Sequence, residues 1–163
     1  MSDPFAEDII AVLPNLKRFA ISLCRRPDLA DDLVQTAVER ALRGRTSYDP
    51  TTRLEPWLFR ILRNAWIDIT RRNQTRGVEV DADTAFDMPT VDGVRDIEAR
   101  LMLDKTNTAL QTLPDEQREV MILVCMQEMT YKEASAILDI PIGTVMSRLA
   151  RGRLALAEKL GIS

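Results

Sequence analysis

The chain contains no histidine, and its six glycines and two cysteines are scattered. The lack of histidine excludes Ser-His-Asp triads, Cys-His dyads and histidine-containing zinc sites. The glycines form neither a GxxxxGK[ST] nor a GxGxxG phosphate-binding loop. Cys24 and Cys125 each lie among apolar residues, so we expect buried free thiols. The sequence therefore predicts no catalytic residue, no metal site and no cofactor, and it argues against an enzyme.

Long apolar runs are also missing from the sequence. No stretch approaches the roughly 20 apolar residues that a membrane-spanning helix needs. The first residues, MSDPFAEDIIAVLP, are acidic and lack the basic start and apolar core of a signal peptide. We therefore expect a cytoplasmic protein without membrane insertion.

The formal net charge of −3 hides an uneven distribution of charge along the chain. Residues 77–98 carry seven acidic residues and one arginine. Residues 53–76 carry six arginines and two acidic residues, and residues 141–154 carry three arginines and no acid. Two basic segments thus flank an acidic middle, which favours a nucleic-acid partner despite the negative total.

The periodicity of apolar residues predicts an all-α fold. No segment shows sustained alternation with β-branched enrichment, which excludes strands as a main element. Between residues 73 and 94 the periodicity is lost and polar or acidic residues dominate. We therefore predict two small helical domains, residues 1–73 and 96–163, joined by an acidic flexible linker at 74–95. The expected helices span residues 9–23, 29–43, 57–72 and 97–113, followed by a helical pair within 130–157.

Residues 130–157 have the pattern of a helix, a tight turn and a basic second helix. Thr130 and Glu133 have the spacing of a capping box, which predicts a helix start. Pro141 should end this helix near Asp139, and the second helix should begin close to Gly143. The inward positions expected on the two helices are Ala134, Ile137, Leu138, Val145, Leu149, Gly152 and Leu156. A helix with one apolar face and one short polar, cationic face suits the DNA major groove; the alternative is an amphipathic hairpin with a solvated basic face.

Four blocks lie in order along the chain: ADDLVQTAVERAL (30–42), EPWLFRILRNAWIDITRR (55–72), LPDEQREVMIL (113–123) and IPIGTVMSRLARGR (140–153). With these blocks the chain resembles, over nearly its whole length, the bacterial ECF (extracytoplasmic-function) sigma factors. Block one is similar to the family's polymerase-binding helix. Block two is similar to the helix that opens the −10 promoter element. Block three leads into the C-terminal domain, and block four is similar to the −35 reader. The resemblance implies sigma region 2 for residues 1–73 and sigma region 4 for residues 96–163.

The resemblance also implies three sets of binding residues. Contacts to core RNA polymerase fall on Asp32, Gln35 and Glu39, a face that would otherwise be read as a solvated acidic surface. Contacts to the −10 element fall on Tyr48, Arg60, Arg63, Asn64, Asp68 and Arg71. Contacts to the −35 element fall on Thr144, Met146, Ser147, Arg148, Arg151 and Arg153. Met146 stands where the family often has Lys or Arg, so promoter preference should differ from that of basic members.

The function implied by the resemblance is promoter-specific initiation of transcription. The sequence of block four is similar to that of the general-stress class of ECF sigma factors from alphaproteobacteria. This similarity implies that the protein transcribes stress-response genes and is restrained by a small anti-sigma factor. Two alternatives remain at this point. One is a sigma-like mimic that sequesters an anti-sigma factor without binding DNA. The other is a conventional helix-turn-helix repressor, which would leave the N-terminal half without a role.

Overall fold

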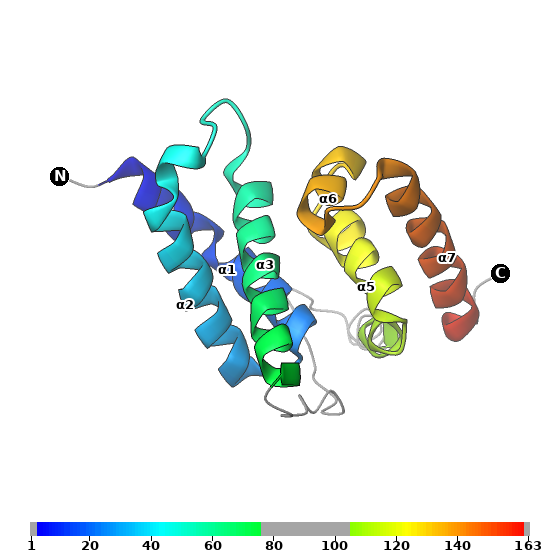
Figure 1. Ribbon diagram of the computed structural model, residues 1–163. Coiled ribbons are helices and arrows are strands. Elements are labelled where there is room, and N and C mark those ends of the chain that lie inside the picture. Colours follow the sequence, from blue (N-terminus) through cyan, green and yellow to red (C-terminus); the bar gives the residue numbers. More distant parts are fainter. Residues whose placement is uncertain (1–2, 76–104, 162–163) are drawn as a thin grey trace, which may run out of the picture. The chain divides into compact units, whose positions relative to one another are not determined.

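The computed structural model describes residues 3–75 and 105–161, and every regular element within these two ranges is helical (Figure 1). The prediction of an all-α fold is confirmed. The elements are α1 (Pro4–Cys24), α2 (Pro27–Arg43), the short 3-10 helix η1 (Arg45–Ser47), α3 (Leu54–Thr75), α5 (Asp115–Met121), the π-helical turn η2 (Ile122–Met126), α6 (Tyr131–Leu138) and α7 (Ile142–Leu160). Residues 105–111 form a further helical stretch before α5.

The chain divides into two compact units. Helices α1, α2 and α3 belong to the first, and α5 and α7 belong to the second. Most of the acidic linker expected at 74–95 lies outside the described residues, as do residues 97–104 of the predicted helix 97–113. The first two residues of the expected linker, 74 and 75, belong to α3 instead. The domain boundaries drawn at residues 73 and 96 stay a prediction.

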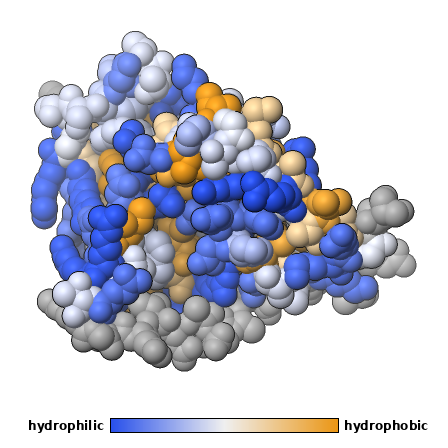
Figure 2. All heavy atoms as spheres, turned by 45° about the vertical axis from the view of Figure 1, so that its right-hand side comes forward, coloured by the Kyte–Doolittle hydropathy of each residue, from blue (hydrophilic) through white to orange (hydrophobic). Residues whose placement is uncertain are grey.

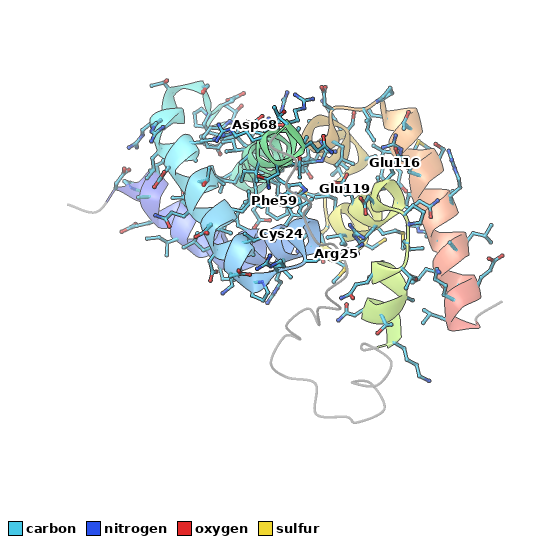
Figure 3. All side chains as sticks on the ribbon, turned by 60° about the horizontal axis from the view of Figure 1, so that its bottom comes forward. Cys24, Arg25, Phe59, Asp68, Glu116 and Glu119 are labelled. Atoms are coloured by element: carbon cyan, nitrogen blue, oxygen red, sulfur yellow. The ribbon has the colours of Figure 1, made fainter. Side chains whose placement is uncertain are left out.

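In the first unit, α1, α2 and α3 pack against one another in all three pairs. Helix α1 begins at Pro4, earlier than residue 9, because Asp3 caps it: the Phe5 N–H donates to the Asp3 carboxylate at 3.1 Å. Phe19 and Phe59, the latter labelled in Figure 3, are fully buried, and their rings stack at a centroid distance of 4.9 Å. The buried residues of this core include Leu16, Leu33, Leu58, Leu62 and Ala65. These side chains form the inward faces of α1, α2 and α3.

In the second unit, the predicted helix start at Thr130 is confirmed. The Thr130 N–H donates to the Glu133 carboxylate at 2.9 Å, and the Glu133 N–H donates to the Thr130 hydroxyl at 3.0 Å. Helix α6 ends at Leu138, followed by Asp139 with a φ of 55°. Pro141 then caps α7, which begins at Ile142 as expected. The two reciprocal bonds thus fix the start of α6, and Pro141 fixes the start of α7.

Helix α7 packs along α5 at a point where it carries a glycine. Gly152 is buried, and a Cβ built on it would lie 2.8 Å from the Met121 Cγ atom. The absence of a side chain therefore allows the two helices to come closer than any other residue would permit. Of the inward positions predicted on α7, Val145, Leu149 and Gly152 are buried, whereas Leu156 is half-buried.

Hydrophilic side chains cover most of the face seen in Figure 2, and apolar side chains form small patches on it. Among the described helices, none is long and apolar enough to cross a membrane. Residues 3–75 and 105–161 also contain no cluster of three histidine, cysteine or acidic side chains that could hold a metal ion.

Candidate nucleic-acid interface

The predicted −35 residues lie on two edges and the outer side of α7. Met146, Ser147, Arg151 and Arg153 are exposed, and the Met146 side chain is 51% accessible. Since successive residues are about 100° apart on a helix, Met146 and Arg153 lie close together on one edge. Ser147 and Arg151 share the outer side, where the Arg151 guanidinium donates to the Ser147 hydroxyl at 3.4 Å. Ser147 and Arg151 thus lie on the side of α7 away from its buried face, and Met146 and Arg153 border that side.

Thr144 and Arg148 lie on the other edge of α7 and are half-buried. An Arg148 Nη2 atom lies 3.7 Å from a carboxylate oxygen of Glu116 on α5, and the arginine side chain is 24% accessible. Figure 3 labels Glu116 on its helix. Arg148 would therefore reach a phosphate only by giving up this loose ion pair, which the spacing of residues along α7 could not reveal.

Sequence reasoning missed the centre of the exposed arc of α7. Ala150 and Leu154 are exposed there, and Leu154 is 65% accessible. Ile142 and Met146 extend the same row by steps of four residues, and both are exposed. The signal was present in the sequence as an apolar residue at every fourth position, but it was outweighed by the nearby arginines. The outer side of α7 is therefore mixed, apolar along its middle and cationic along its borders.

Three of the predicted −10 residues form one stripe on α3. Arg60, Asn64 and Arg71 are all exposed. Their spacing of four and seven residues places them on one side of the helix, opposite Leu62, over an axial length of about 16 Å. The described structure therefore presents two guanidinium groups and one amide in a row along this helix.

The other predicted residues of α3 flank that stripe. Arg63 is half-buried on one side of it. Asp68 is on the other side, labelled in Figure 3, where its carboxylate accepts a hydrogen bond from the Arg40 guanidinium of α2 at 3.0 Å. Both side chains of this pair are partly accessible to solvent. Asp68 thus links α2 to α3, and it would contact a base edge only by leaving Arg40.

Tyr48 lies in the loop between α2 and α3, beyond the end of the stripe. Its ring lies 5.1 Å from the Trp57 ring and 5.9 Å from the Phe5 ring, and its hydroxyl donates to the Thr52 carbonyl at 2.6 Å. Trp57 is half-buried and belongs to the same aromatic cluster. The cluster holds the loop against the first unit and leaves Tyr48 partly accessible.

The predicted polymerase-binding residues of α2 share one exposed face. Asp32, Gln35 and Glu39 are exposed, and Leu33 and Ala37 are buried on the opposite side. The neighbouring acid, Asp31, pairs with Lys17 of α1 at 3.2 Å. The face is thus acidic and is built on a helix whose other side belongs to the core.

The two cysteines have different environments. Cys24 is buried, and loss of hydration raises the pKa of its thiol. Cys125 is exposed on the π-helical turn, so the expectation that both thiols are buried was wrong for Cys125. A π-helical turn rotates its residues away from the α-helical period, which the sequence pattern does not show.

Comparison with known proteins agrees with this arrangement. Residues 9–76 match the model of Sigma-70 region 2, and residues 103–156 match the model of Sigma-70, region 4. The chain is 37% identical over 160 residues to the ECF RNA polymerase sigma factor EcfG of Rhodopseudomonas palustris, which covers 98% of this chain and 87% of the relative. It is 31% identical to the ECF RNA polymerase sigma factor SigW of Bacillus subtilis, over 97% of this chain and 89% of the relative.

A solved structure is similar over the same length. The sigma factor RpoE of Bartonella quintana, crystallised in complex with the anti-sigma factor NepR, is 34% identical to this chain. It matches with a TM-score of 0.77 over 98% of both chains. The predicted resemblance is thereby confirmed: this chain belongs to the family of ECF RNA polymerase sigma factors.

Proposed function

We propose that this sigma factor binds core RNA polymerase through the acidic face of α2 and recognises promoter DNA through α3 and α7. It acts in the cytoplasm and has no catalytic activity of its own, in keeping with the regulatory role of sigma factors. The observation that carries the proposal is the placement of the three residue sets. Each set includes exposed side chains on a helix whose opposite side is buried in the core.

The row on α3 suits a DNA strand that has left the duplex. Arg60 and Arg71 can neutralise phosphates, and Asn64 between them can hydrogen-bond the edge of an exposed base. Opening the −10 element costs a few kcal/mol for each unstacked base, so a fixed row of contacts along the strand is needed to offset it. Asp68 contributes chiefly by holding α2 against α3 through Arg40.

The outer side of α7 suits the major groove of the −35 element. Ser147, Arg151 and Arg153 can contact phosphates and base edges, as the polar residues of recognition helices do. Met146 cannot form the two hydrogen bonds that an arginine makes with guanine, but it can pack against a thymine methyl group. We therefore expect the −35 preference of this protein to favour thymine over guanine at the position that Met146 contacts.

A protein anti-sigma factor is proposed as the regulator of this chain. The support is the similarity to RpoE of Bartonella quintana, which was solved with the anti-sigma factor NepR. Assignment to the general-stress class of ECF sigma factors rests on the amino-acid sequence of block four, residues 140–153. A mimic that binds only the anti-sigma factor would not need the exposed arginines of α3 and α7, and a repressor would not need the acidic face of α2.

The polymerase contact is tested with two variants that remove the same charge from adjacent positions. Asp32→Asn should slow association with core polymerase about three- to tenfold at low salt, because charges at the rim of an interface act mainly on the rate of encounter. Asp31→Asn is the matched control, since Asp31 is turned toward Lys17 of α1. Association rates measured by stopped-flow fluorescence should differ between the two. Equal rates for the two variants and the wild type would remove this face from the polymerase contact.

A further inference from the structure

The first residues of α1 are joined to the loop between α2 and α3 by an ion pair. The Arg45 guanidinium donates to both carboxylate oxygens of Asp3, at 2.7 and 3.0 Å. Paired bonds of this kind fix the orientation of both groups as well as their distance. The pKa of the Asp3 carboxyl is lowered, first of all by the bond from Arg45. Figure 1 shows the start of α1 and η1 at the same end of the first unit.

Aromatic contacts join the same two segments. The Arg45 guanidinium carbon lies 4.8 Å from the centre of the Phe5 ring, a distance that suits a cation–π contact. Phe5 also lies 5.9 Å from Tyr48 of the loop and 6.0 Å from Trp57 of α3. The start of α1 therefore contacts the loop twice, once through Asp3 and once through Phe5.

The loop itself is closed by short-range bonds. The Ser47 N–H donates to the Gly44 carbonyl, and the Asp49 carboxylate accepts from the N–H and the hydroxyl of Thr51. These bonds fix the shape of the loop but do not fix its position on the helices. At its two ends the loop is joined to α2 by the bond from the Gly44 N–H to the Arg40 carbonyl and to α3 by the Arg53–Glu55 ion pair. Between these ends its position depends on the contacts of Arg45 and Tyr48 described above.

We propose that Asp3 and Phe5 are positioning residues for the −10 contact: they hold Arg45 and Tyr48, and thereby place the loop of residues 44–53 for the displaced DNA strand. This inference rests on the proposed recognition of the −10 element and on the −10 contact that the family resemblance implies for Tyr48 of this loop. A loop held in its binding position before DNA arrives loses less conformational entropy on binding. Arg45 in this arrangement is a structural cation, and Tyr48 presents one defined edge of its ring.

Three variants separate positioning from helix stability. Asp3→Asn keeps an oxygen that can cap α1, since asparagine is as good an N-cap as aspartate, but it removes the charge facing Arg45. Phe5→Leu keeps an apolar side chain and removes the ring under the guanidinium. Glu7→Gln is the control, because Glu7 is an exposed acid in the first turn of the same helix.

The first measurement needs no DNA. Hydrogen exchange of the Ser47 and Thr51 amides should be about three- to tenfold faster in Asp3→Asn than in Glu7→Gln, because the bonds within the loop open more often once the loop has left its position on the helices. Exchange within α1 should stay the same in both variants. Equal exchange of the loop amides in the two variants would overturn the inference.

The second measurement uses holoenzyme and fork-junction DNAs that differ at single bases of the unpaired −10 segment. We expect Asp3→Asn and Phe5→Leu to lower the ratio of affinities for preferred and substituted bases about three- to tenfold, with Glu7→Gln at the wild-type ratio. A lower melting temperature with an unchanged ratio would show a structural role only and overturn the inference. If the wild-type holoenzyme itself does not discriminate among these DNAs, the proposed −10 function fails, and that result is visible without any variant.

Discussion

Replacement of Gly152 by alanine tests the close packing of α7 on α5. In an open helix this change stabilises by about 1 kcal/mol, because alanine has the higher helix propensity. At Gly152 the new Cβ would lie 2.8 Å from the Met121 Cγ and 3.2 Å from its Sδ, whereas carbon atoms in contact are about 3.5–4.0 Å apart. Met121 is 5% accessible, and its Cγ moves only if χ1 or the backbone moves. Such overpacking costs about 1–3 kcal/mol, so we expect a net destabilisation of up to about 2 kcal/mol.

The same substitution at Gly143 is the matched control on the same helix. Nothing lies within 4 Å of a Cβ built there, so Gly143→Ala should leave stability unchanged or raise it by up to about 1 kcal/mol. Urea unfolding followed by circular dichroism measures both free energies of unfolding. In a Met121→Ala background, the cost of Gly152→Ala should disappear, as expected for two residues in direct contact. A Gly152→Ala protein at least as stable as Gly143→Ala would refute the packing described for α5 and α7.

Two further predictions concern the second unit and the thiols. Thr130→Ala should lower the free energy of unfolding by about 0.5–2 kcal/mol, because it removes the hydroxyl that accepts from the Glu133 N–H in the capping box. An unchanged midpoint of urea unfolding would contradict this prediction. In the native protein Cys125 should react rapidly with iodoacetamide, whereas Cys24 should react only after unfolding or at markedly higher pH, since burial raises the pKa of its thiol. Mass spectrometry of the alkylated peptides shows which cysteine is labelled first. Labelling of Cys24 before Cys125 would exclude the described packing of α1.

The sequence was sufficient for the features that depend on local chemistry. The capping box at Thr130, the helix end before Pro141 and the inward positions Val145 and Leu149 all follow from rules that act within a few residues. The acidic face of α2 was also predictable, because Leu33 and Ala37 mark the opposite side by their spacing. Such features depend on residues close together in the sequence, so contacts between helices do not alter them.

The features that depend on contacts between helices were not predictable. Phe59 is buried because α3 packs against both α1 and α2 and therefore buries a wider arc than the single apolar stripe of Leu58, Leu62 and Ala65. The family resemblance implies a DNA contact for Asp68, but the sequence contains no signal that Arg40, 28 positions earlier, is its partner. Arg148 and Glu116 are a second case of this kind. A helical wheel shows which way a side chain points but not what it meets.

The most direct test of the central claim is run-off transcription with core RNA polymerase and this protein on a library of promoters. We expect transcripts that start at defined sites, and we expect them to be lost when either the −35 or the −10 element of a selected promoter is replaced. Holoenzyme assembly, followed by gel filtration in the same samples, is the control. An assembled holoenzyme that gives no start-site-specific transcript on any promoter would contradict the account and favour a sigma-like mimic.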